Sequence, residues 1–225
     1  MFVGHLGVGL ALKTVEPKIN VGILLFASLF LDLLLGLFVL AGLEQILVPV
    51  NYSQLHYLHF SFPYSHSLIA ALLWSFAASC LAYVMLAGYQ QFRLKAAMVI
   101  SAAILLHWLC DWLEHPSQLP VAGESSRMLG LGLWNHMETA LALEVLLVAA
   151  GTILYLRGAK KIGSKARLSM LLLMLLLVVV AVAGQATVTQ APQQVVLATS
   201  LVVQSIVICG LCAWIDRARE GIASE

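Results

Sequence analysis

Charge is the scarcest property of this 225-residue chain. Only 10% of its residues are charged whereas 61% are hydrophobic, and the mean hydropathy is +0.96. Soluble domains carry about 25% charged residues, so this composition excludes a soluble globular protein and predicts a polytopic membrane protein. The formal net charge is only +1 and no basic domain lies outside the apolar segments, which argues against a nucleic-acid partner.

Cysteine is almost as scarce. The four cysteines all lie inside apolar runs, which argues against a disulfide framework, and they are Cys80, Cys110, Cys209 and Cys212. The last two form a CxxC without a second pair, so we interpret them as packing residues. Residues 1–12 lack a charged start and a small-residue cleavage site, and we do not expect them to be a cleaved signal peptide.

Long apolar segments make up most of the chain. Six are long enough to cross a bilayer, and they are residues 21–43, 65–88, 96–115, 133–156, 168–186 and 195–215. Residues 1–12 are apolar but would reach only about 18 Å as a helix, so they predict a half-length helix packed closely against others. The fold class is therefore an all-α polytopic membrane protein, a bundle of about six spanning helices plus a short N-terminal helix.

We expect one transmembrane domain, residues 1–225. Residues 1–156 carry the polar site, and residues 157–225 form a basic cytoplasmic turn and two scaffold helices. Eleven of the twelve Lys and Arg residues fall on one side of the predicted topology, and only Arg127 falls on the other. The positive-inside rule then predicts a multi-pass protein of the inner (plasma) membrane with its N-terminus outside, its C-terminus in the cytoplasm and all seven histidines towards the outside.

Polar residues gather most densely in residues 105–115, LLHWLCDWLEH, at the end of an apolar run. On a helix His107 and Asp111 are i,i+4 neighbours, so their side chains point the same way. An imidazole and a carboxylate are costly in apolar surroundings unless they are paired or bind a metal. A locally hydrogen-bonded helix end is the structural alternative.

The topology brings further candidate ligands to the level of His107 and Asp111. His66 completes the core of a predicted metal site, and His5 and Asp32 are further ligands to the same ion or to a second one. Imidazole and carboxylate ligands suit a divalent metal ion, most plausibly Zn²⁺, with Mn²⁺ or Fe²⁺ as alternatives.

For the other polar residues the sequence gives less specific predictions. His136 and Glu138, at the start of a span, would complete the ligand shell or act as a general base. Glu144 lies deeper in that span and is either structural or functional. Three more histidines are expected to be solvated loop residues: His56, His59 and His115.

Several of these residues occur in a pattern that resembles the YdjM-like family of bacterial membrane-bound metal-dependent hydrolases. The pattern consists of His5-x-x-x-Gly9, Asp32, Ser65-His66-Ser67 and His107-x-x-x-Asp111. The chain departs from it in two places, because the family has Pro-Asp-x-Asp around Asp32 and a His-Arg-Gly lead-in before the Ser-His-Ser. The resemblance implies a metal site and hydrolase activity.

The favoured function is hydrolysis of an ester or phosphoester in a lipid or another membrane-associated substrate. A cation or proton transporter that uses the same His and Asp residues is the main alternative. Haem ligation by two of the intramembrane histidines is a third possibility. The sequence leaves the oligomeric state open.

Overall fold

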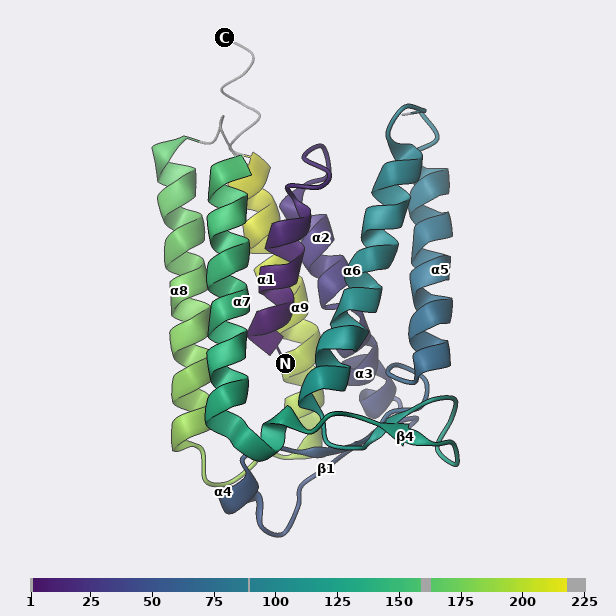
Figure 1. Cartoon of the computed structure of the whole chain (residues 1–225), viewed down its shortest axis with the longest axis vertical. Coiled ribbons are helices and arrows are strands. Elements are labelled where there is room, and N and C mark those ends of the chain that lie inside the picture. Colours follow the sequence, from purple (N-terminus) through teal and green to yellow (C-terminus); the bar gives the residue numbers. More distant parts are fainter. Residues whose placement is uncertain (1, 89, 159–162, 218–225) are drawn as a thin grey trace.

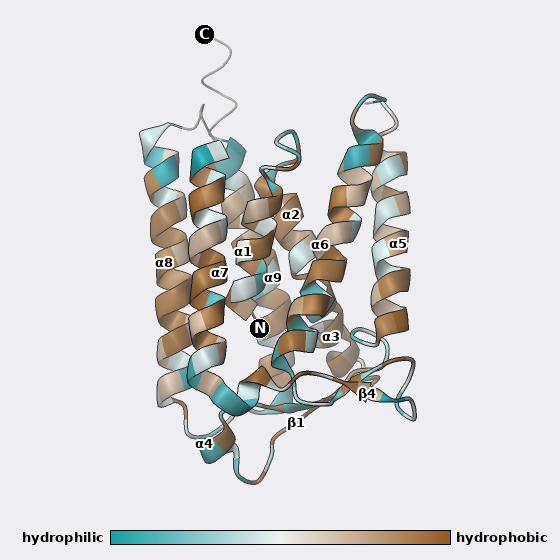
Figure 2. Cartoon of the chain, viewed as in Figure 1, coloured by the Kyte–Doolittle hydropathy of each residue, from teal (hydrophilic) through white to brown (hydrophobic). Residues whose placement is uncertain are grey.

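The computed structural model describes residues 2–88, 90–158 and 163–217, and helices dominate these residues (Figure 1). Five helices are long and apolar enough to cross a membrane: α5 (Leu68–Met85), α6 (Arg93–Glu114), α7 (Met137–Gly158) with the preceding turn η1 (Leu133–His136), α8 (Ser164–Thr187) and α9 (Gln194–Arg217). A bent pair, α2 (Val21–Ser28) and α3 (Phe30–Leu40), is long and apolar enough only when its two helices are taken together, so the described residues contain five candidate spans, or six when this pair counts as one. The predicted all-α membrane bundle is confirmed. Figure 2 shows the expected distribution, with hydrophobic residues along the helices and hydrophilic residues at their ends.

The span predicted as one helix over residues 21–43 is broken. The axes of α2 and α3 differ by 54°, and Leu29 lies at the break. Leu29 is fully buried. It packs into one hydrophobic cluster, whereas Ala27 and Leu31, two residues before and after it, pack into another. The bend therefore follows from tertiary packing, since neither Pro nor Gly occurs at the break.

The short helix α1 (Phe2–Leu12) lies in the middle of the bundle between longer helices, as expected (Figure 1). It packs against α7 at two glycines. A Cβ atom on Gly7 would overlap the Leu147 carbonyl, and a Cβ atom on Gly151 would overlap the backbone of Gly7. This close approach of two backbones holds α1 inside the bundle, as small residues commonly do in membrane proteins.

Glu144 of α7 binds the N-terminal turn of α1. Its Oε2 accepts hydrogen bonds from the backbone N–H groups of Val3, at 3.1 Å, and Gly4, at 3.2 Å. A carboxylate at this position satisfies exposed helix donors and interacts favourably with the helix dipole. The structure thus gives Glu144 a structural role, which was one of its two expected roles.

The connections made by residues 41–67 and 115–136 gather at one end of the bundle, called the loop side below (Figure 1). They contain the short helix α4 (Tyr52–Leu55) and two antiparallel ribbons. Strand β1 (Gln45–Leu47) pairs with β2 (His59–Ser61), and β3 (Leu119–Pro120) pairs with β4 (Met128–Leu129). The ribbons were not predicted, and they cover the end of the bundle where the polar residues lie.

A buried ion pair joins four helices near the opposite end. Asp216 accepts hydrogen bonds from Lys13 Nζ at 2.8 Å, the Val21 N–H at 2.9 Å and the Tyr155 hydroxyl at 3.0 Å. Lys13 was expected in a polar turn, but only 6% of it is exposed. These hydrogen bonds offset the desolvation of the two buried charges, and loss of one partner would leave a costly isolated charge.

Candidate metal centre

His107 and Asp111 share one face of α6, and both side chains are buried. The distance between His107 Nε2 and Asp111 Oδ2 is 3.1 Å. His66 lies two residues before α5. Its Nε2 is 3.4 Å from the same carboxylate oxygen, Asp111 Oδ2. The Nε2 atoms of the two histidines are 3.2 Å apart. Three ligand atoms from two separate parts of the chain therefore meet at one buried point.

The break between α2 and α3 orients His107. Ser28 is the last residue of α2, and its backbone carbonyl accepts a hydrogen bond from His107 Nδ1 at 2.7 Å. A carbonyl can only accept, so Nδ1 carries the proton and Nε2 keeps its lone pair. The ring of His5 stacks on that of His107 with centroids 3.7 Å apart, which further restricts the ring.

A chain of hydrogen bonds from the loop side orients His66. The Ser65 hydroxyl donates to Glu44 Oε2 at 2.7 Å and therefore accepts from His66 Nδ1, also at 2.7 Å. Glu44 Oε1 accepts the N–H groups of Tyr64 and Ser65 at 2.8 Å each. Burial raises the pKa of Glu44, and the hydrogen bonds from Ser65 oppose that effect. His66, like His107, thus has a proton on Nδ1 and a free lone pair on Nε2.

These tautomers create an electrostatic problem that a cation solves. Two Nε2 lone pairs and one carboxylate oxygen lie within 3.4 Å of one another, and neither Nε2 carries a proton when both imidazoles are neutral. Facing lone pairs repel each other, and the buried carboxylate adds negative charge to the same space. A cation, either a metal ion or an extra proton, compensates all three groups at once.

The spacing fits a small divalent metal ion. Bonds of about 2.0–2.2 Å to nitrogen and oxygen place neighbouring ligand atoms about 2.8–3.1 Å apart in an octahedral site and about 3.3–3.6 Å apart in a tetrahedral site. The three separations here are 3.1, 3.2 and 3.4 Å. Two neutral imidazoles and a carboxylate are also a donor set that Zn²⁺, Mn²⁺ and Fe²⁺ accept. His66, His107 and Asp111 could therefore hold one such ion.

Asp32 lies at the margin of this group. Its Oδ1 is 3.8 Å from His66 Nε2 and 4.0 Å from His107 Nε2. Its side chain is 14% exposed, whereas the side chains of His66, His107 and Asp111 are at most 2% exposed. Asp32 is in the first turn of α3, so the break in the span also directs this carboxylate into the cluster. It could supply a fourth ligand on the more open side.

His5 belongs to the cluster but contacts the far oxygen of the carboxylate. Its Nε2 is 3.1 Å from Asp111 Oδ1, and its Nδ1 is buried without a hydrogen-bond partner among the described residues. His5 also forms a possible ligand group with Asp32 and His107. Since His107 has only one free nitrogen, this group and the group of His66, His107 and Asp111 describe one ion position rather than two.

The expectation that His115 is a solvated loop residue is wrong. It is only 4% exposed, because residues 116–136 fold back over the end of α6. Gln118 accepts the Phe60 N–H through Oε1 and donates through Nε2 to His115 Nδ1 at 2.9 Å. His115 Nε2 then carries the proton, and it faces Asp111 Oδ1 at 3.9 Å. Burial also holds the pKa of His115 well below its usual value, which keeps the ring neutral, and the proton on its Nε2 faces Asp111 rather than leaving a lone pair for the ion.

The remaining candidates are not brought to the cluster. His136 and Glu138 are exposed, and in the described part of the chain no hydrogen bond or ion pair joins either to the five clustered residues. His56 and His59 are both partly exposed, as expected, although His59 lies in strand β2 rather than in a loop. Haem ligation by His66 and His107 does not fit, because nitrogens 3.2 Å apart leave no room for the macrocycle between them.

Comparison of the chain with protein-family models, curated proteins and solved structures found no match. The class of protein is therefore set by the fold and the cluster alone. The chain is a multi-pass membrane protein with a buried His/Asp group that could bind a metal ion.

Glu44→Gln provides a test of the hydrogen-bond chain behind His66. A neutral amide cannot accept from the two N–H groups and the hydroxyl as the carboxylate does, so His66 loses its fixed orientation. We expect metal affinity to fall by about 10–100-fold, the usual cost of losing a group that orients a metal ligand. Titration of metal-free protein with Zn²⁺ measures the change.

Glu124→Gln is the matched control for Glu44→Gln. Glu124 is also a loop carboxylate that accepts from a serine hydroxyl, that of Ser61, but it has no bond to the chain behind His66. Its affinity for Zn²⁺ should equal that of the wild type. Equal affinities in both variants would remove Glu44 from the support of the metal centre.

Proposed function

We propose that the protein is an integral-membrane metal-dependent hydrolase that cleaves an ester or phosphoester bond in a membrane-associated substrate. The convergence of His66 Nε2, His107 Nε2 and Asp111 Oδ2 within 3.1–3.4 Å carries this proposal. Asp32, at 3.8–4.0 Å from the two imidazoles, is the fourth ligand. A divalent ion held there would polarise the scissile group and lower the pKa of a water molecule.

The residues of the chain have separate tasks in this proposal. His5 holds Asp111 through its Oδ1 at 3.1 Å, and His115 Nε2 faces the same oxygen at 3.9 Å, which leaves Oδ2 directed at the ion position. The Ser28 carbonyl and the Ser65 hydroxyl keep His107 and His66 in the tautomer that can bind a metal. The partial exposure of Asp32 marks the side on which a substrate group can approach. The resemblance of these motifs to the YdjM-like hydrolases supports the same reaction class.

Hydrolysis in proteoliposomes tests the proposal. Protein reconstituted into vesicles of phosphatidylethanolamine and phosphatidylglycerol should release fatty acid, diacylglycerol or a phosphorylated head group, which mass spectrometry can identify. A chelator should abolish the release and added Zn²⁺ or Mn²⁺ should restore it. Failure of metal-loaded protein to cleave any ester or phosphoester in a broad lipid panel would contradict the proposed activity.

A specific observation favours a second candidate function, cation or proton transport. Broken spanning helices with ionisable residues at the break are common in transporters, and α2 and α3 form such a pair with Asp32 just beyond the break. The described residues of the opposite half contain the Lys13–Asp216 pair, whose hydrogen bonds close that region. Transport would require this pair to open, and we therefore place hydrolysis first.

The sidedness of the metal centre can be measured separately. We propose that the loop side faces away from the cytoplasm, because Arg127 is the only Lys or Arg residue in the loop-side connections. Ser53→Cys and Ser125→Cys should react with a membrane-impermeant maleimide in intact spheroplasts, whereas Ser164→Cys should react only after lysis. The wild type, with its four native cysteines, gives the background. The reverse pattern would place the centre on the cytoplasmic side.

A further inference from the structure

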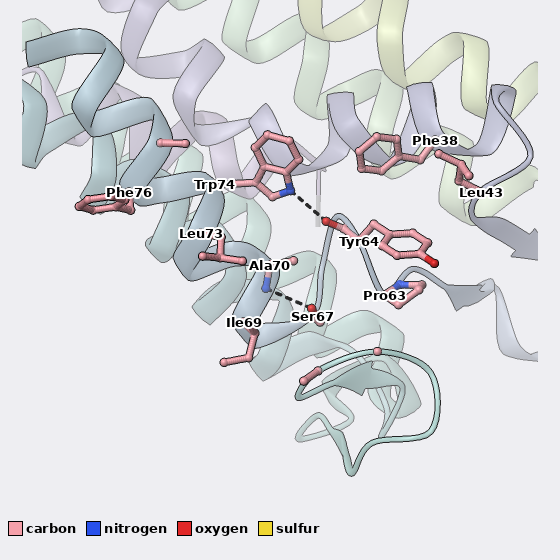
Figure 3. A pocket seen from close by; sticks show the side chains of 13 residues that line it. Phe38, Leu43, Pro63, Tyr64, Ser67, Ile69, Ala70, Leu73, Trp74 and Phe76 are labelled. Atoms are coloured by element: carbon pink, nitrogen blue, oxygen red, sulfur yellow. Dashed lines mark hydrogen bonds between the residues drawn. The ribbon is translucent and has the colours of Figure 1, made fainter. Parts of the chain in front are cut away.

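A cleft of about 810 Å³ lies beside the metal centre, between the end of α3 and the first half of α5 (Figure 3). Phe38 of α3 lies opposite Leu73 and Trp74 of α5, and Pro63 and Tyr64 form one end. The Trp74 indole N–H donates to the Tyr64 carbonyl at 2.9 Å, which ties that end to α5. No charged residue lines the cleft, so its chemistry is that of a hydrocarbon site.

The position of the cleft in the membrane determines what can fill it. Its α5 residues belong to a spanning helix whose apolar side chains face outward, with Leu73 63% exposed and Phe76 68% exposed. α5 packs mainly on α6, which leaves the side towards α3 open. Bilayer hydrocarbon surrounds this part of the helix, and a space without charges does not retain water there. An acyl chain is thus the occupant that matches both the lining and the surroundings.

Two structural elements connect the cleft to the metal centre. Ser67 lines the cleft and directly follows His66, and its hydroxyl caps α5 by accepting the Ala70 N–H at 3.1 Å. Phe38 lines the opposite wall and shares α3 with Asp32. The cleft therefore ends one residue from a proposed metal ligand, on the loop side of the membrane. A chain in the cleft would place its polar linkage near that end.

We propose that this cleft binds one acyl chain of a bilayer lipid and that this lipid is the substrate. The proposal rests on the proposed hydrolase function, and it names the substrate class of the same site. Hydrolysis then adds one water across the scissile ester or phosphoester bond: the hydroxyl goes to the acyl carbon or the phosphorus, and the proton goes to the leaving oxygen. The lipid enters sideways from the leaflet on the loop side, without leaving the bilayer.

Photo-crosslinking tests binding without any need for hydrolysis. Full-length protein is reconstituted with a phosphatidylethanolamine that carries a diazirine in one acyl chain, and the labelled peptides are identified by mass spectrometry. We expect label on the cleft walls, in peptides containing Phe38 or Leu73. Ala70→Trp fills the cleft and should lose this label while the metal content stays at the wild-type value. Ala77→Trp fills another part of the cleft, and it replaces Ala70→Trp in this test if Ala70→Trp does not fold.

Leu172→Trp is the matched control, because Leu172 lies on the exposed face of α8, away from α3 and α5. It should keep the cleft label. Hydrolysis adds a second readout: Ala70→Trp should raise KM for long-chain lipids far more than KM for a short-chain ester, since lost methylene contacts weaken mainly the longer substrate.

The outcomes separate the two proposals. Label in the cleft without any lipid hydrolysis would support the acyl-chain binding site and contradict the proposed hydrolase function. Hydrolysis that Ala70→Trp and Ala77→Trp leave unchanged, with label spread evenly over all lipid-facing helices, would retain the hydrolase and overturn the cleft as its substrate site.

Discussion

Purified His107→Ala protein should contain no bound divalent metal, whereas the wild type should contain about one ion per chain. His107 supplies the Nε2 atom that lies 3.2 Å from His66 Nε2 and 3.1 Å from Asp111 Oδ2, so its loss removes the central ligand of the group. Loss of an orienting partner alone costs about 10–100-fold in metal affinity, and loss of a ligand costs at least as much. Hydrolysis should disappear together with the metal.

Elemental analysis of detergent-purified protein, before and after treatment with a chelator, measures this difference. Cys212→Ser is the control, because Cys212 is as buried as His107 but belongs to the hydrophobic cluster around α9. It should keep its metal. A His107→Ala protein that unfolds would be uninformative by itself, so Asp111→Asn, which keeps the shape of the side chain, should be measured in parallel. Full metal content in Asp111→Asn would remove this carboxylate from the ligands.

The main architecture could be predicted because it depends on residue composition over long windows. Six apolar segments of about 20 residues have few alternatives to spanning helices, since a bilayer leaves no other partner for their backbone groups. The half-length of α1 followed from the 12-residue apolar segment that was predicted to form it. Its position inside the bundle agrees with the close backbone contact at Gly7 and Gly151. These properties depend mainly on the length and composition of each segment by itself.

The break at Leu29 could not be predicted in the same way. Leucine favours a helix, and no Pro or Gly marks the site. The bend exists because α2 packs on α1 and the C-terminal half of α9, whereas α3 packs on the N-terminal half of α9 and on loop-side residues, which is a property of the whole bundle. It matters for the metal centre because it directs the Ser28 carbonyl to His107 and begins the helix that carries Asp32.

The sequence indicated the clustered residues but not their supports. His5, Asp32, His66, His107 and Asp111 lie close together in the structure, as their convergence on one level suggested. Glu44 was missed because it lies in a loop without periodicity, where it is buried against Tyr64 and Ser65. His115 was missed because its burial at the end of α6 depends on residues 116–136 covering the end of the bundle. One local signal existed for Glu44, a carboxylate at the start of a loop that otherwise lacks charged residues up to residue 67.

Asp32→Asn should distinguish the hydrolase from the transporter. In the hydrolase, Asp32 is a ligand whose negative charge the metal compensates, and the amide is a much weaker ligand with no charge. Metal affinity should therefore fall by about 10–100-fold and hydrolysis should be lost, while the fold is retained because the amide has the same size and costs little to bury. A proton-carrying Asp32 predicts unchanged metal content and the loss of a pH-dependent flux.

Both quantities can be measured on the same proteoliposomes. Zinc, manganese and iron per chain are determined in the wild type and in Asp32→Asn, and an entrapped pH-sensitive dye reports proton flux under an imposed gradient. Glu138→Gln is the control, because Glu138 is an exposed carboxylate outside the cluster and should leave metal and flux unchanged. Reduced metal in Asp32→Asn, with no proton flux in either protein, agrees with a ligand. Unchanged metal together with a flux that only the wild type shows would replace the hydrolase by a transporter, because Asp32, with its 14% exposure, would then carry protons past an ion that binds without it.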